Sequence, residues 1–181
     1  METVTSSAES TAVEDRVVGP LRAVRRPLHE GLMILQAAAE AVTSAEPALA
    51  FKALDRALAF LQRTFLPACE AEEFTLFIAV DGVYGATGAV AVMRAQHQVM
   101  VEMAGDLEKV VAAAKQANDP AAFAKFLHPL LFGLYGLARG HLESEDAAYL
   151  TILDEHLSES QVGVIVDNLD RIASARRAPA R

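Results

Sequence analysis

Residues 54–73 read LDRALAFLQRTFLPACEAEE, and this stretch decides the fold class of the chain. Its apolar side chains recur at the spacing of one face of an α-helix: Leu54, Leu58, Leu61, Phe65 and Leu66. Pro67 predicts a kink in this helix just before Cys69. Cys69 and Glu73 are one helical turn apart, so both side chains should point from the same face toward a core.

The rest of the chain shows further helical patterns and no alternating strand pattern. We predict long helices over about 17–42, 48–78, 87–116 and 121–156, and a short last helix ending near residue 173. The segments between them contain helix-breaking residues and predict loops: 43–47, 81–85 and 118–120. The predicted fold is therefore all-α, an up-down four-helix bundle with a short C-terminal helix, over residues 17–173. Residues 1–16 and the basic tail 174–181 are expected to be flexible.

Composition narrows the class of protein. The chain has 181 residues, of which 52% are hydrophobic, so it can bury a substantial core as one domain. A net charge of −8 argues against sequence-independent nucleic-acid binding, and no uncharged apolar run is long enough to span a membrane. A single cysteine excludes an internal disulfide. We expect a cytoplasmic protein without nucleic-acid or membrane partners, whose many apolar positions would allow a homodimer.

Each long helix carries residues that can bind a metal ion: His29, the pair Cys69 and Glu73, His97, and the pair His141 and Glu145. In a pair one turn apart, an imidazole or thiol and a carboxylate can face the same ion. The competing interpretation is that a lone histidine on an apolar face is a hydrogen-bonded core residue. Neighbouring acids are predicted to be surface charges: Glu70, Glu72, Glu143 and Asp146.

This pattern resembles the hemerythrin-like family, also called the HHE cation-binding domain. The resemblance rests on residues 28–30, 65–73, 96–97 and 140–146, within about 18–172. It implies an up-down bundle around a non-heme di-iron centre, in which two carboxylates bridge the irons. Carried over by residue, His29 would bind one iron, His97 and His141 would bind the other, and Glu73 and Glu145 would form the bridges.

The chain departs from the family pattern at two positions. Cys69 stands where the family has a histidine, and Val101 stands where oxygen carriers have a second histidine of the third helix. Open coordination positions favour chemistry on O2, peroxide or NO over simple oxygen carriage. Cys69 has three interpretations: a small buried hydrophobe, a thiolate ligand, or a position replaced by another donor. Candidates for extra ligands are Cys69, Glu102 and Tyr149.

Three classes of function therefore stay open. The first is a di-iron protein that reacts with O2, peroxide or NO, as an oxidase, an oxygenase, a catalase-like enzyme or a sensor. The second is a non-catalytic binder of metal or oxygen, and the third is a helical interaction module with a degenerate metal site. We favour the first, with two iron ions as cofactor, although manganese or a mixed pair fits the same donors. The sequence does not single out a catalytic residue or a substrate.

Overall fold

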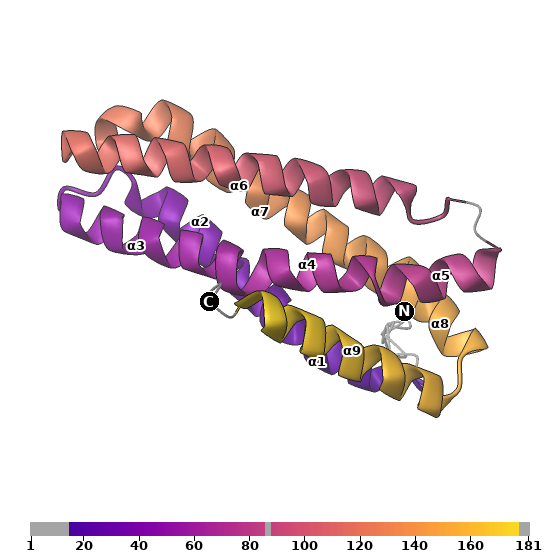
Figure 1. The fold of residues 1–181 in the computed structure, drawn as a ribbon. Coiled ribbons are helices and arrows are strands. Elements are labelled where there is room, and N and C mark those ends of the chain that lie inside the picture. The colour runs from indigo at the N-terminus through magenta and orange to yellow at the C-terminus, as the bar shows by residue number, and fades with distance from the viewer. Residues whose placement is uncertain (1–14, 86–87, 178–181) are drawn as a thin grey trace, which may run out of the picture.

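The computed structural model describes residues 15–85 and 88–177, which form helices and contain no strand. Five helical rods run through the molecule, and several consist of consecutive helices in line (Figure 1). The first rod consists of α1 (Gly19–Gly31) and α2 (Met33–Ala41), and the second consists of α3 (Pro47–Phe60), the π-helical turn η1 (Leu61–Phe65), α4 (Leu66–Glu73) and α5 (Leu76–Tyr84). The third rod is α6 (Ala91–Ala117). The fourth consists of the 3-10 turn η2 (Ala121–Phe123), α7 (Ala124–Ser144), the π-helical turn η3 (Glu145–Tyr149) and α8 (Leu150–His156), and the fifth is α9 (Glu159–Arg177).

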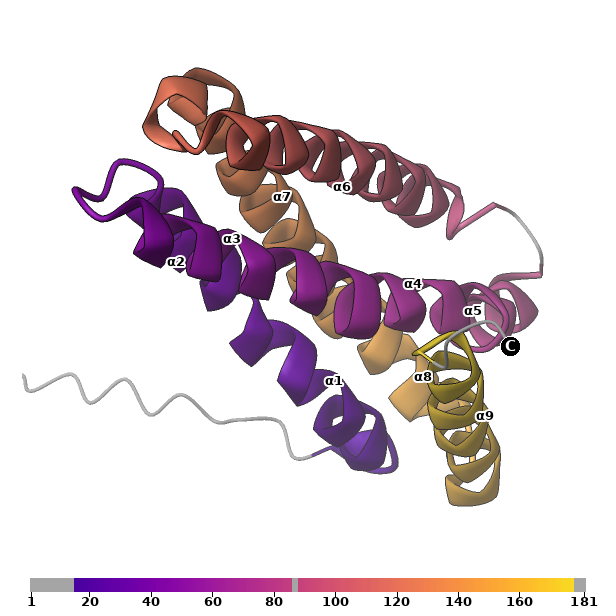
Figure 2. The same ribbon diagram turned by 60° about the vertical axis from the view of Figure 1, so that its left-hand side comes forward.

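Four rods form the bundle, and the fifth lies against one side of it. Helix α2 packs on α3 and α7, and α6 packs on α7 and α3. Successive rods run in opposite directions, with the α2–α3 and α6–α7 connections at one end of the molecule (Figure 1). Helix α9 packs on α4 and α1 (Figure 2). The predicted all-α, up-down bundle is therefore confirmed.

The helix boundaries differ from the predicted ones at several points. Helix α5 runs through Tyr84 and ends at Gly85, whose φ of 77° is in the left-handed region, so most of the predicted loop 81–85 is helical. The first rod is interrupted between α1 and α2, next to Gly31, where a Cβ atom would overlap the ring of Phe60. Helix α9 has 19 residues and is longer than the short helix we predicted.

Two π-helical turns interrupt the rods that later supply the carboxylates of the site. In η1 the N–H of Leu66 donates to the carbonyl of Leu61, five residues back, and the next residue is Pro67, which has no N–H to donate. In η3 the N–H of Leu150 donates to the carbonyl of Glu145. Such turns are frequent at functional sites because they shift the register of the helix by one residue.

The interior consists of two apolar cores with a polar layer between them. The α2–α3 core includes Leu35, Leu54, Phe65, Met100 and Leu131, and the α5–α8 core includes Leu21, Phe77, Val80, Met93 and Leu150. In α1, buried Arg25 lies between Leu21 of one core and Leu28 of the other. The polar layer, defined as Arg25, Glu72, His97, His141 and Glu145, is buried in the same way. Each rod of the bundle thus changes from apolar to polar and back at about the same level.

Asp154 of α8 fixes the chain entering α1. One of its oxygens, Oδ1, accepts from the backbone N–H groups of Val17 at 2.6 Å and Val18 at 2.9 Å. The other, Oδ2, accepts from the N–H of Arg16 at 2.9 Å. These bonds satisfy N–H groups at the start of a helix that have no partner within it. They hold the pKa of Asp154 below its usual range.

Residues 121–156 are long and apolar enough to cross a membrane, by length and composition alone. The core helix of a soluble protein can pass the same test, and this rod supplies Leu127, Leu131 and Leu134 to the α2–α3 core. It also carries His141 and Glu145 of the polar layer. The absence of a membrane partner therefore stays a prediction.

Candidate metal centre

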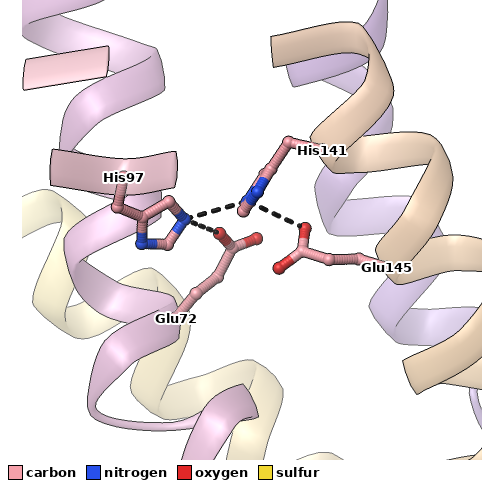
Figure 3. Close-up of side chains that lie close together, drawn as sticks. All are labelled: Glu72, His97, His141 and Glu145. Carbon is pink, nitrogen blue, oxygen red and sulfur yellow. Dashed lines mark hydrogen bonds and ion pairs between the residues drawn. The ribbon is translucent and has the colours of Figure 1, made fainter. Parts of the chain in front are cut away.

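Four of the polar-layer residues converge on one point in the interior. They are Glu72 from α4, His97 from α6, His141 from α7 and Glu145 from η3 (Figure 3). One ligand atom from each lies within 4.8 Å of all the others. All four side chains are buried, so a metal ion held here would be shielded from bulk water.

Both imidazoles are oriented by acceptors outside this group of four. The Nδ1 atom of His97 lies 2.8 Å from Oε1 of Glu73, and Nδ1 of His141 lies 2.9 Å from Oε1 of Gln96. Carboxylate and amide oxygens accept hydrogen bonds, so each Nδ1 carries the ring proton. The lone pair on each Nε2 then faces the centre. Metal-binding histidines in proteins are held in the same way, with the other ring nitrogen donating to an acceptor.

The two Nε2 atoms lie 2.9 Å apart. If both carried lone pairs with nothing between them, they would repel each other, so a cation must be shared between them. A proton on one ring satisfies this need, and so does a metal ion. Two nitrogens that each bind one ion at about 2.1 Å are themselves roughly 3.0–3.4 Å apart. The observed separation is close to that range.

The carboxylates leave one oxygen each without a hydrogen bond. Oε1 of Glu72 accepts from Nη1 of Arg25, and Oε2 of Glu145 accepts from Nη2 of the same guanidinium at 2.6 Å. The remaining oxygens, Oε2 of Glu72 and Oε1 of Glu145, are buried and have no hydrogen-bond partner among residues 15–85 and 88–177. Buried carboxylate oxygens without partners are costly unless a cation binds them. The donor set thus provides two nitrogens and two carboxylates for one ion.

Burial and neighbouring charges set the protonation of the centre. Burial, aided by the charge of Glu72, raises the pKa of Glu145 to about 8 despite Arg25. Burial acts on Glu72 as well, but Arg25, His97 and His141 together outweigh it and lower the pKa of Glu72. Burial lowers the pKa of His141 to about 4, so this imidazole is neutral near pH 7. His97 is buried as well, but Glu72 and Glu73 outweigh burial and raise its pKa.

The structure brings three of the predicted metal ligands together and replaces a fourth. His97, His141 and Glu145 belong to the group of four, but Glu73 does not. Glu73 binds Nδ1 of His97 and pairs with Arg94. The prediction that Glu72 is a surface charge was wrong, because this residue is 1% exposed. Glu72 and Glu73 follow Cys69 by three and four residues, and both spacings fit one face of a helix.

His29, the predicted ligand of the other iron, lies outside the group of four. Its side chain is 34% exposed, and its Nε2 atom lies 3.0 Å from Oδ2 of Asp146. Asp146, predicted to be a solvated charge, is 27% exposed and also accepts from Nε of Arg25 at 3.2 Å. Arg25 therefore contacts both the group of four and the partner of His29.

The three candidates for extra ligands also lie outside the group of four. Cys69 is buried in the α2–α3 core, and burial raises its pKa well above the usual value, which fits the interpretation as a small hydrophobe. Glu102 is exposed and accepts from Gln98 at 2.9 Å. The hydroxyl of Tyr149 donates to the carbonyl of Ala89 at 2.8 Å, so it is already engaged.

Besides Glu72, sequence reasoning missed two residues of the site, Arg25 and Gln96. Arg25 lies four residues after Leu21 and three before Leu28, both buried, so the spacing of apolar residues would have placed it on the inner face of α1. This signal was not recognised because Arg25 stands next to Arg26 and close to Arg22, in a segment rich in positive charge. Gln96 precedes His97 and offers no comparable signal, because its role depends on how α6 and α7 pack.

A cavity of about 400 Å³ lies beside the centre between α4 and α6. Its walls include His97, Glu73, Arg94, Cys69 and Val101. Phe77 stacks on the imidazole of His97 with ring centroids 5.1 Å apart, on the side of the α5–α8 core. The cavity is large enough for a small molecule and reaches one of the four candidate ligands.

Residues 21–153 match the family model described as the Hemerythrin HHE cation binding domain. This range covers most of the chain and contains Arg25 and all four converging residues. The search of curated proteins and the search of solved structures returned no match.

Proposed function

We propose that this chain, which belongs to the hemerythrin HHE cation-binding family, holds non-heme iron in its buried centre and reacts there with O2, peroxide or NO. The observation that carries the proposal is the approach of His97 Nε2 to His141 Nε2 at 2.9 Å, with both Nδ1 protons donated outward. That arrangement needs a cation between the rings. The unpartnered oxygens of Glu72 and Glu145 point to a metal ion rather than a proton alone.

The residues present fit such an ion. Imidazole with carboxylate is a donor set suited to iron, and manganese and zinc accept similar donors. Glu72, His97, His141 and Glu145 would hold the ion, and a small molecule would be able to bind to it as a further ligand. Bound iron would supply one-electron chemistry with O2, peroxide or NO. The sequence predicted two iron ions, and a second ion would have to draw on His29 and on Asp146, which is bonded to Arg25.

The protein contributes orientation and access. Glu73 and Gln96 hold the two rings with Nε2 inward, and Phe77 packs on His97 and limits water from the α5–α8 side. A small molecule can approach His97 through the cavity between α4 and α6. Arg94, which lines this cavity and pairs with Glu73, adds positive charge that favours anionic oxygen species.

Metal analysis of protein purified without chelators tests the proposal. Iron should be present in the wild type and lost in His97→Ala and His141→Ala. His156→Ala is the matched control, because His156 is exposed, lies outside the four converging residues and has a ring nitrogen bonded to the carbonyl of Ile152. Wild-type protein that binds no iron, manganese or zinc would overturn the proposal and favour the helical interaction module.

Reaction with small molecules separates an enzyme from a binder. Ferrous protein should give an EPR signal with NO that is absent from His97→Ala, and it should consume peroxide or O2. Reversible binding without turnover would place the chain among the non-catalytic binders.

The net charge of −8 and the single cysteine support our further proposal of a cytoplasmic protein without a nucleic-acid partner.

A further inference from the structure

We infer that Arg25 is a built-in cation in the position of a second metal ion, so that the chain binds one ion where its sequence predicted two. The inference rests on the proposed function for the ion that remains. Its basis is the placement of one buried guanidinium between two carboxylates from different rods, Glu72 of α4 and Glu145 of η3.

The contacts of Arg25 are those expected of a bridging cation. Nη1 binds Glu72, Nη2 binds Glu145 at 2.6 Å, and Nε binds Asp146 at 3.2 Å. The side chain is 2% exposed, so these carboxylates have taken the place of water around the guanidinium. A planar guanidinium is suited to such contacts, because its N–H groups point in fixed directions.

The charges balance for one ion and not for two. Arg25 contacts three carboxylates, those of Glu72, Glu145 and Asp146. One divalent ion together with Arg25 neutralises all three, provided that both histidines are neutral. A second divalent ion would leave two excess positive charges in the interior, which has a low effective dielectric constant.

The positions of the donor atoms around Arg25 also favour one ion over two. A second ion that shared Glu72 and Glu145 would compete with Arg25 for Oε1 of Glu72 and Oε2 of Glu145, to which the guanidinium is bonded. Oε2 of Glu145 also lies 3.4 Å from Nε2 of His141. Oε2 of Glu72 lies 3.6 Å from Nε2 of His97. Asp146, a remaining donor for that ion, already accepts from Nε of Arg25, and His29 lies against the other oxygen of Asp146.

The consequence is a centre that does not need metal in order to fold. In a site held together by two ions, removal of metal leaves buried carboxylates facing each other. Here Arg25 stays between Glu72 and Glu145, so the apoprotein keeps the ion pair between Arg25 and Glu72 and the hydrogen bond from Arg25 to Glu145.

The test compares Arg25→Ala with Arg26→Ala, a control in which the adjacent and exposed arginine is removed. Apoprotein is titrated with Fe2+ under anaerobic conditions, and the melting temperature is measured in EDTA. Wild type and Arg26→Ala should saturate at one equivalent and melt at similar temperatures in EDTA. Arg25→Ala should take up a second equivalent, and in EDTA it should melt about 10 °C lower, with recovery when metal is added.

A second variant covers the case in which Arg25→Ala does not fold. Arg25→Lys keeps the charge but loses the planar fork, so it should still saturate at one equivalent and melt between wild type and Arg25→Ala. Saturation of the wild type at two equivalents would overturn the inference, as would identical stoichiometry and melting of Arg25→Ala and Arg26→Ala.

If the proposed function is wrong, the metal titrations give a different result from the one that overturns only the role of Arg25. If neither the wild type nor any variant binds metal, the proposed iron centre fails and the one-ion count fails with it. The melting temperatures in EDTA then still decide whether Arg25 is the cation that holds the buried carboxylates.

Discussion

The polar layer and the α2–α3 core are enclosed by the same four rods, but different forces hold them. In the core, Leu54, Leu131 and their neighbours stabilise the fold by burying apolar surface. Each of these side chains packs against many others, and the interaction has no preferred direction. In the polar layer each group depends on particular partners, as Arg25 does on Glu72 and Glu145. A change in the core should therefore affect stability, and a change in the polar layer should affect metal binding first.

The largest effect is expected for Glu72→Ala. This substitution removes one of four donors and one partner of Arg25, so metal affinity should fall by about 100-fold or more. Competition with a chromophoric chelator measures the affinity. Glu70→Ala is the matched control, because Glu70 is on the same helix but pairs with Arg176 at the surface. Equal affinities of the two variants would remove Glu72 from the centre.

Leu131→Ala tests the other side of the comparison. Leu131 is fully buried in the α2–α3 core, so its truncation should leave a cavity and lower the free energy of unfolding by about 2–5 kcal/mol. Urea denaturation measures this loss. The metal content per folded chain should stay at the wild-type value. A loss of metal in the folded variant would show that the two layers are not independent.

Glu73→Ala should have a smaller effect on metal binding than Glu72→Ala. Glu73 does not belong to the four converging residues but accepts the Nδ1 proton of His97. Loss of such an acceptor lowers metal affinity by about 10-fold, because the ring is no longer held in place. The same competition assay applies. A larger loss for Glu73→Ala than for Glu72→Ala would restore the bridging role that the sequence predicted for Glu73.

Asp154→Ala should change stability by the smallest amount and leave metal binding unchanged. Asp154 lies outside both layers and holds the N-terminus of α1, so its loss should cost about 1 kcal/mol. Backbone hydrogen bonds lower its pKa in the folded state. Its contribution is therefore complete above its unfolded pKa of about 3.9 and is lost as the pH falls through the folded value.

Unfolding of wild type and Asp154→Ala across pH 2–6 measures this contribution. The difference in unfolding free energy between the two proteins should be constant above about pH 5 and shrink toward lower pH. A difference that is independent of pH would mean that the carboxylate charge of Asp154 plays no part.

The sequence predicted the helices because apolar spacing and Pro- or Gly-containing breaks are local signals. It also predicted His97, His141 and Glu145, since each lies on the stripe of a rod that faces the core. It chose Glu73 over Glu72 because helical spacing does not distinguish positions three and four residues after Cys69. His29 was placed in the centre by resemblance, whereas packing turns it toward Asp146.

Arg25 could not be assigned from the sequence in its full role, because that role depends on three carboxylates from two other rods. The spacing of Leu21 and Leu28 predicts only that position 25 faces inward. The partners of Arg25 are decided by the packing of α1 against α4 and η3. Glu72 and Glu145, which these two elements supply, are 47 and 120 residues away from Arg25 in the chain.

Anomalous diffraction from crystals of protein loaded with iron tests the central claim most directly. We predict one peak per chain, about 2.0–2.3 Å from Nε2 of both His97 and His141, with Arg25 still between Glu72 and Glu145. A peak between His29 and Asp146, or no peak beside the two imidazoles, would contradict the account.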